Sequence, residues 1–312
     1  MLSKIFFKNK RSGTILLSQV VVSAGNFLSF LMLARLLGIN EFGYFSSLWL
    51  VVMFTSSVLI SVSVFPLMTN FQKVSLPDRN DFISGTLVYS IFILLILCLM
   101  SLPLLGIIRL SEFIPLVLCI CCINYQEIVR RILITKDAPE GALISDLCTY
   151  SVRLIVLVML GFKGLLETTE ALWAFAFSAF LGIAVVQRQV PALRGGHNST
   201  MTAWRMNFDS AKWLLPSGMM QWTSINLFIS AAAFLISPAA VGIIKLCQSL
   251  LAVFNILIQV AENIIPIKAV KIFQHEGYRG LFIYGSKVSL LGAIPFIVLS
   301  LIFLLFGEVI VG

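Results

Sequence analysis

Residues 241–266 read Val241-Gly-Ile-Ile-Lys-Leu-Cys-Gln-Ser-Leu-Leu-Ala-Val-Phe-Asn-Ile-Leu-Ile-Gln-Val-Ala-Glu-Asn-Ile-Ile-Pro266, and this stretch decides the fold. It has the length and apolar character of a membrane-spanning helix. Its polar residues recur every three or four positions, which places them on one helical face: Lys245, Gln248, Asn255, Gln259 and Glu262. Such a polar stripe must face water or other polar groups.

Comparable apolar segments recur along the whole chain. Of its 312 residues, 59% are hydrophobic and 12% are charged, with a mean hydropathy of +1.00. The segments are continuously apolar and do not alternate, which excludes a β-barrel and predicts an all-α polytopic membrane protein. At about 20 residues per span, we predict about nine transmembrane helices, near 14–34, 43–66, 83–108, 114–134, 142–162, 169–187, 212–235, 241–265 and 283–306.

The net charge of +8 is explained by membrane topology, and no nucleic-acid partner is expected. If the N-terminus is cytoplasmic, nearly all Lys and Arg residues fall in inner loops and inner helix ends, and the outer side holds only Arg35, Arg109 and Lys163. The positive-inside rule therefore predicts a multi-pass protein with a cytoplasmic N-terminus and with residue 312 on the outer side.

This topology makes a prediction for reporter fusions. A reporter that works only outside the cytoplasm should be active when it is fused after residue 312, because an odd number of spans separates the two ends. Activity of a cytoplasm-only reporter at that position would contradict the topology.

The six cysteines all lie within predicted spans. Cys119, Cys121 and Cys122 are close in sequence, but no His or carboxylate accompanies them, and His197 and His275 fall in inner loops. We interpret the cysteines as small buried hydrophobic residues, and we expect no metal site and no cofactor.

The first predicted hairpin carries a recognisable pattern. Leu33-Ala-Arg-Leu-Leu-Gly38 is followed by Glu41-Phe-Gly-Tyr-Phe45. Gly38 can end the first helix in a left-handed cap, and Glu41 suits the positive N-terminal end of the second helix. The pattern resembles the first-hairpin signature of the polysaccharide biosynthesis exporters, the Wzx-type flippases for O-antigen and other lipid-linked oligosaccharides, within the multidrug/oligosaccharidyl-lipid/polysaccharide superfamily.

A second patch is similar to this family. Gln126-Glu-Ile-Val-Arg-Arg131 closes the fourth predicted helix, and Asp146 and Arg153 follow on the fifth. The resemblance covers residues from about 12 to 290. It implies two six-helix lobes, twelve to fourteen helices in all, so this chain would hold a complete first lobe and the first three helices of a second.

The chain also shows a weak internal repeat. An offset of 199 positions aligns Leu36-Leu37-Gly38 and Gly43 with Leu235-Ile236-Ser237 and Gly242. Because both hairpins start on the inner side, the lobes would be parallel repeats related by an axis along the membrane normal. We therefore expect an N-terminal lobe at 1–190, an inner inter-lobe loop at 191–211, and a partial C-terminal lobe at 212–312.

Arg153 is the leading candidate for function. It lies about 16 Å along its helix at 1.5 Å per residue, close to the middle of the bilayer. A guanidinium there costs at least about 3 kcal/mol unless it faces water or a partner. Arg153 can bind an anionic substrate, or it can form a structural ion pair with Asp146 or Glu127. Lys245 can join Arg153 in binding the diphosphate group of a lipid-linked oligosaccharide, the substrate class that the resemblance implies, or it can extend toward the outer lipid headgroups.

Polar residues on other helices complete the expected cavity. Gln19, Asn26, Asp146, Gln221, Gln248, Asn255 and Gln259 are candidate lining residues, and Glu127 and Glu262 are candidates for proton or sodium coupling. Isolated amides can equally form hydrogen bonds between helices, and each glutamate can pair with a nearby cation.

The leading functional hypothesis is transport. We expect a flippase that moves a polyprenyl-diphosphate-linked oligosaccharide across the bacterial inner membrane, with membrane lipids and glycan polymerase or ligase proteins as partners. The sequence has no His-Glu-x-x-His motif and no phosphate-binding Gly-rich loop with Lys, which disfavours a membrane-embedded transferase. The alternatives are a drug or cation exporter of the same superfamily, and a membrane assembly partner of a glycan-export complex that does not itself transport.

Overall fold

The computed structural model describes residues 10–75, 77–106, 108–191 and 196–249, together with 272, 276–290 and 293. All regular structure in these residues is helical, and no strand occurs among them. The chain divides into two compact units, Met1–Leu250 and Leu251–Gly312. The described part of the second unit is a helix at 276–290, so the predicted span at 283–306 lies largely outside the described residues.

Six segments of the described part are long and apolar enough to cross a membrane, and they match the first six predicted spans. Their elements are α2 (Lys10–Leu37); α3 (Ile39–Leu59), η1 (Ile60–Val64) and α4 (Phe65–Asn70); α5 (Arg79–Met100) with η3 (Leu102–Gly106); α6 (Leu110–Thr135); α7 (Pro139–Phe162); and α8 (Thr168–Val186) with η4 (Gln187–Gln189). Large apolar side chains such as Phe92 and Phe162 are exposed, as lipid-facing surfaces require. The protein is therefore a multi-pass helical membrane protein.

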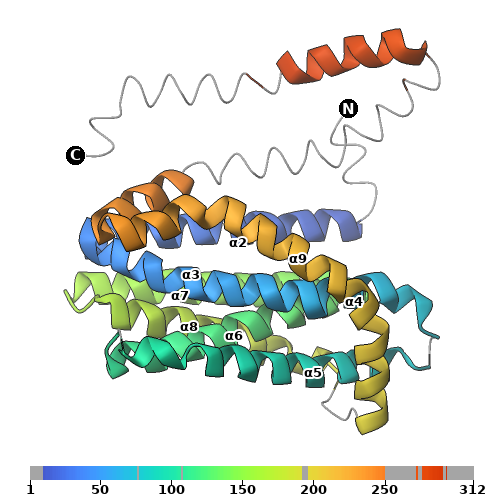
Figure 1. The fold of residues 1–312 in the computed structure, drawn as a ribbon, viewed down its shortest axis with the longest axis horizontal. Coiled ribbons are helices and arrows are strands. Elements are labelled where there is room, and N and C mark those ends of the chain that lie inside the picture. Colours follow the sequence, from blue (N-terminus) through green and yellow to red (C-terminus); the bar gives the residue numbers. More distant parts are fainter. Residues whose placement is uncertain are drawn as a thin grey trace. The chain divides into compact units, whose positions relative to one another are not determined.

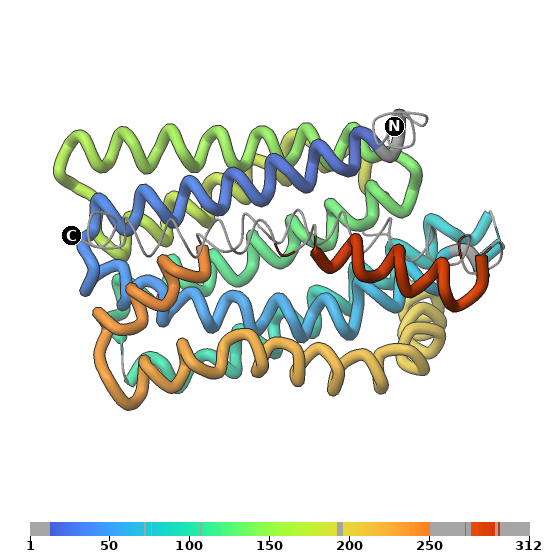
Figure 2. The backbone as a smooth tube through the Cα atoms, turned by 90° about the horizontal axis from the view of Figure 1, so that it is seen from above, coloured from blue at the N-terminus to red at the C-terminus, as the bar shows by residue number. Residues whose placement is uncertain are grey.

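The six candidate membrane segments lie side by side along one direction (Figures 1 and 2). The most extensive contacts join α6 to α8, α7 to α8, α2 to α7, and α5 to α9 (His197–Leu235). An aromatic cluster fills the core between α2, α3 and α8, where the Trp49 and Phe175 rings lie 4.9 Å apart at 71°. Phe30 and Phe45 complete this cluster, with ring centroids 6.2 Å apart.

The turn between α2 and α3 depends on Gly38. Its φ of 75° is positive, as the sequence predicts, but its ψ of 162° is extended, so the expected left-handed helical cap is wrong. Only glycine adopts this combination easily. The helix that follows has Glu41 in its first turn, where a carboxylate stabilises the helix dipole.

The segment 191–211, expected to be an inner loop, is helical from His197 onward. It forms the start of α9 (His197–Leu235), which changes direction along its length (Figure 1). The helix contains Pro216, a residue type that commonly kinks helices. Trp204 packs edge-on against Tyr89 of α5, with ring centroids 5.4 Å apart. The fully buried Asn207 donates to the Tyr89 hydroxyl at 2.8 Å. These contacts fix the start of α9 against the first unit's core.

The seventh and eighth predicted spans are described in part. The range 212–235 forms the second half of α9, which is not among the six candidate spans. A helix then covers 238–249, and the remainder of the span predicted at 241–265 lies outside the described residues. Whether these helices belong to a second lobe stays a prediction.

The helix at 238–249 crosses the start of α3 at very short range. A Cβ atom added to Gly43 would lie 1.7 Å from the Pro238 carbonyl oxygen, and one added to Gly242 would lie 2.6 Å from the Ile39 carbonyl oxygen. Real side chains cannot approach a backbone so closely. Both glycines are therefore required by the helix crossing.

We expect Gly43→Ala to lower the apparent melting temperature of the purified protein by several degrees, because overpacking costs about 1–3 kcal/mol. Gly106→Ala is the matched control, since a Cβ atom there meets nothing within 4 Å. Equal melting temperatures for the two variants would show that the helices do not cross this closely.

Candidate functional site

Arg153 of α7 is buried inside the helix bundle, with 3% of its surface exposed. Its guanidinium lies between two aromatic rings, 4.1 Å from the Phe175 centroid and 4.8 Å from the Tyr150 centroid. Its Nε donates to Ser178 Oγ at 3.2 Å, and its Nη1 donates to Asn26 Oδ1 at 3.4 Å. No carboxylate in the described part of the chain pairs with it. Arg153 is therefore a buried cation held by rings and neutral oxygens.

The ion pairs that the sequence suggested for Arg153 involve a different arginine. Asp146, 1% exposed, accepts a hydrogen bond from Nε of Arg130 at 3.0 Å. Glu127 pairs with Arg131 at 2.6 Å and contacts Arg130 at 3.4 Å. Neither Asp146 nor Glu127 pairs with Arg153, so the alternative interpretation of Arg153 as the partner in a structural ion pair is wrong.

Arg130 also binds α2. Its Nη2 donates to Gln19 Oε1 at 3.1 Å and lies 3.4 Å from Ser18 Oγ. The Ser18 hydroxyl itself donates to Asp146 Oδ2. One polar network therefore joins α2, α6 and α7.

Arg153, Arg130, Asp146 and Glu127 line one cavity of about 180 Å³. The remaining lining residues come from α2, α3, η1, α6 and α7 and include Asn26, Gln126 and Tyr150. This volume suits a small polar group such as a phosphate or diphosphate. The structure thus brings Arg153 together with three of the other predicted residues, Asn26, Asp146 and Glu127.

Lys245 approaches the same aromatic cluster that holds Arg153. Its Nζ lies 5.3 Å from the ring centroid of Phe30, and the Phe30 and Phe175 centroids are 6.2 Å apart. Arg153 contacts the other of these two rings, that of Phe175. The two predicted diphosphate-binding cations therefore contact one aromatic cluster, although Lys245 does not line the cavity of Arg153.

The other predicted lining residues are dispersed. Gln248 donates to the backbone carbonyl of Ile225 on α9 at 3.0 Å, and Gln221 is exposed on α9. Gln19 serves the Arg130 network. Asn255, Gln259 and Glu262 lie outside the described residues, so their predicted roles stay predictions.

Sequence reasoning missed the buried state of Arg130. The positive-inside argument treats Arg130 and Arg131 alike, as cations near a helix end, but the side chain of Arg131 is 30% exposed against 7% for Arg130. Helical phase was the available signal. Gln126 and Arg130 are one turn apart and share the buried face of α6, whereas Glu127 and Arg131 share the neighbouring, partly exposed face.

The cysteines are only partly as expected. Cys119 is buried and donates to the Leu172 carbonyl at 3.0 Å, whereas Cys247 is exposed, so its predicted burial is wrong. The sulfur atoms of Cys98 and Cys121 are 3.5 Å apart.

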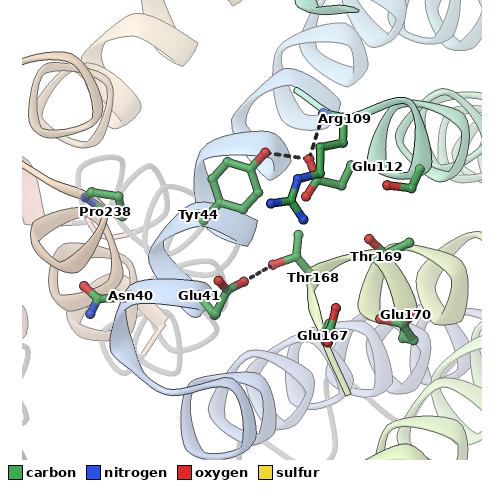
Figure 3. A pocket seen from close by; sticks show the side chains of 11 residues that line it. Asn40, Glu41, Tyr44, Arg109, Glu112, Glu167, Thr168, Thr169, Glu170 and Pro238 are labelled. Carbon is green, nitrogen blue, oxygen red and sulfur yellow. Dashed lines mark hydrogen bonds between the residues drawn. The ribbon is translucent and has the colours of Figure 1, made fainter. Parts of the chain in front are cut away.

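A second, larger cavity of about 820 Å³ lies where the N-termini of α3, α6 and α8 meet (Figure 3). Four glutamates line it: Glu41, Glu112, Glu167 and Glu170. Glu112 accepts from Tyr44 at 2.7 Å and from the Arg109 backbone, and Glu41 accepts from Thr168 at 2.9 Å. Most of these carboxylates lie at first turns of helices, where they offset the helix dipoles.

Comparison with known proteins does not assign the chain to a family. No family model matches the chain, and neither a curated protein nor a solved structure resembles it significantly.

The Arg130 network makes a stability prediction. Arg130→Gln should lower the apparent melting temperature far more than Arg131→Gln, because it leaves Asp146 buried without its cation, at a cost of about 3–5 kcal/mol. Loss of the partly exposed ion pair between Arg131 and Glu127 should cost about 1 kcal/mol or less. Thermal unfolding of the purified variants at pH 8, where protons help the orphaned carboxylate least, compares them. Equal losses would contradict the assignment.

Proposed function

We propose that this protein is a flippase that moves a polyprenyl-diphosphate-linked oligosaccharide across a bacterial inner membrane. The observation that carries the proposal is the buried Arg153, which lines a cavity and has no carboxylate partner in the described part of the chain. A charged side chain within membrane-spanning helices is costly, and such residues usually mark the pathway of a substrate or an ion. The sequence resemblance to polysaccharide exporters supplies the substrate class.

The surroundings of Arg153 favour an anionic ligand. The rings of Phe175 and Tyr150 cover the guanidinium and leave the charge uncancelled. The two carboxylates of the cavity, Asp146 and Glu127, are already engaged by Arg130 and Arg131. In this mechanism Arg153 holds the diphosphate, Lys245 approaches from the other side of the aromatic cluster, amides bind sugar hydroxyls, and the lipid tail stays in the bilayer.

The helix crossing supports the proposed parallel repeat. Applying the offset of 199 to Ile39 and Gly43 gives Pro238 and Gly242. Gly43 faces the Pro238 carbonyl, and Gly242 faces the Ile39 carbonyl, so the contact is reciprocal. Reciprocal contacts between equivalent residues are expected where a two-fold axis passes between them. Two parallel lobes could then alternate access by rocking about this axis.

Energy coupling and partners belong to the same proposal. Glu127 and Glu262 are the proposed proton or sodium sites, and glycan polymerase or ligase proteins are the proposed partners. The proposed orientation has a cytoplasmic N-terminus.

A cation exporter is the second candidate, because four glutamates line the larger cavity. Their roles at helix N-termini weaken this alternative, as does the uncancelled positive charge of Arg153. Resistance of expressing cells to cationic dyes would favour the exporter. Co-purification with glycan-assembly proteins without any flipping would favour a non-transporting assembly partner.

We expect Arg153→Gln to abolish glycan export in cells that lack other flippases, because the neutral amide cannot bind the diphosphate. Arg153→Lys should retain part of the activity, since the charge remains but the planar guanidinium is lost. Arg131→Gln controls for loss of one arginine on a neighbouring helix. Unchanged export by a folded Arg153→Gln protein would exclude this role.

A further inference from the structure

We infer that the protonation state of Asp146 controls whether Arg130 can bind the substrate. Protonation of Asp146 frees Arg130 to bind the anionic group of the substrate beside Arg153, and we call this pair of residues the latch. The inference rests on the proposed function, because it assigns the regulation of the same cavity. It also adds Asp146 to the proposed coupling carboxylates Glu127 and Glu262, and it adds Arg130 to Arg153 as a cation that binds the substrate anion.

The first observation is the direct contact between Asp146 and Arg130. Oδ2 of Asp146 accepts from Nε of Arg130 at 3.0 Å, and both side chains line the cavity that holds Arg153. Arg130 is 5% exposed and Asp146 is 1% exposed, so bulk water does little to weaken their attraction. While Asp146 is ionised, it competes with any ligand anion for Arg130.

The second observation is that Arg130 has other acceptors ready. Gln19 Oε1 lies 3.1 Å from its Nη2, and Glu127 Oε2 lies 3.4 Å from its Nη1. Arg130 therefore does not become an isolated charge when Asp146 is neutralised. The cation stays hydrogen-bonded at the cavity wall, with its strongest carboxylate contact removed.

The charged and titratable groups around Asp146 are few. Helix α6 contributes Arg130 and Glu127, with Arg131 held by Glu127. Helix α7 itself contributes Tyr150 and Arg153. From α2 come the neutral Ser18 and Gln19, and α8 presents Gly182 to Ser145 beside Asp146. Among these, Asp146 is the only carboxylate that is both fully buried and bound to Arg130 through Nε.

The proton balance follows directly. One proton from solvent adds to the carboxylate of Asp146, and the net charge of the cavity rises by one. A diphosphate then meets Arg153 and Arg130 together. When the proton leaves toward the other side, the carboxylate recaptures Arg130, and the ligand loses one of its two cations. No covalent bond is made or broken.

The test measures binding of inorganic pyrophosphate to the purified full-length protein between pH 5.5 and pH 8. We expect wild-type affinity to rise about tenfold toward low pH, a typical coupling between two sites. Asp146→Asn should bind tightly throughout this range. Because the ionisation of pyrophosphate itself changes equally for every variant, the comparison between variants isolates the protein's contribution.

Glu112→Gln is the carboxylate control, because Glu112 lines the other cavity, and it should keep the wild-type pH dependence. Glu127→Gln tests the competing carboxylate of the same cavity. Loss of the dependence in Glu127→Gln, with retention in Asp146→Asn, would overturn the inference in favour of Glu127. If Asp146→Asn does not fold, Ser18→Ala provides the test. Removing this hydroxyl donor destabilises the ionised carboxylate of Asp146. Asp146 should then bind its proton at higher pH, so the pH midpoint of pyrophosphate binding should move upward.

The outcomes separate the two proposals. Pyrophosphate binding that depends on Arg153 but not on pH, beyond the ionisation of the ligand, would overturn the latch and leave the flippase proposal intact. Absence of pyrophosphate binding in folded wild-type protein at every pH would overturn the anion site, and the latch with it.

Discussion

A positive charge inside a membrane-spanning bundle has to be compensated from within the protein, and the compensation of Arg153 governs how the rest of the site is built. Two rings and two neutral oxygens hold its guanidinium, and no described carboxylate reaches it. Rings stabilise a cation without cancelling its charge. The consequence is a cavity wall that stays attractive to anions although it lies deep in the core.

Arg130 shows the opposite solution only a short distance away. It is tied to a buried carboxylate, and its remaining donors reach α2. The two arginines thus divide the tasks between them, since one carries an available charge and the other joins three helices. Their placement on one cavity is what makes a link between proton binding and anion binding physically reasonable.

Much of the fold could be predicted from the sequence, because apolar runs of membrane length leave few alternatives to helices. The burial of Arg153 could be predicted for the same reason, as its depth followed from its position within such a run. The partner of Asp146 could not, because a carboxylate near two adjacent arginines can pair with either, and only the helical phase of α6 separates them. The continuous course of α9 from His197 could not be predicted either, since the polar residues of 191–211 suggested a loop between lobes, whereas Asn207 uses its amide to bind α4 and α5.

The π-helical turn η1 in the second membrane segment changes the direction of the side chains that follow it. A π turn absorbs one additional residue, so the side chains beyond Val64 are rotated by about 100° relative to an uninterrupted α-helix. Ser57, before this turn, and Asn70, after it, both bond to α9, through the carbonyl of Gly218 and through Asn207. The inserted residue therefore acts as a register correction, which lets the helical stretches on both sides of the π turn bond to one neighbouring helix, α9.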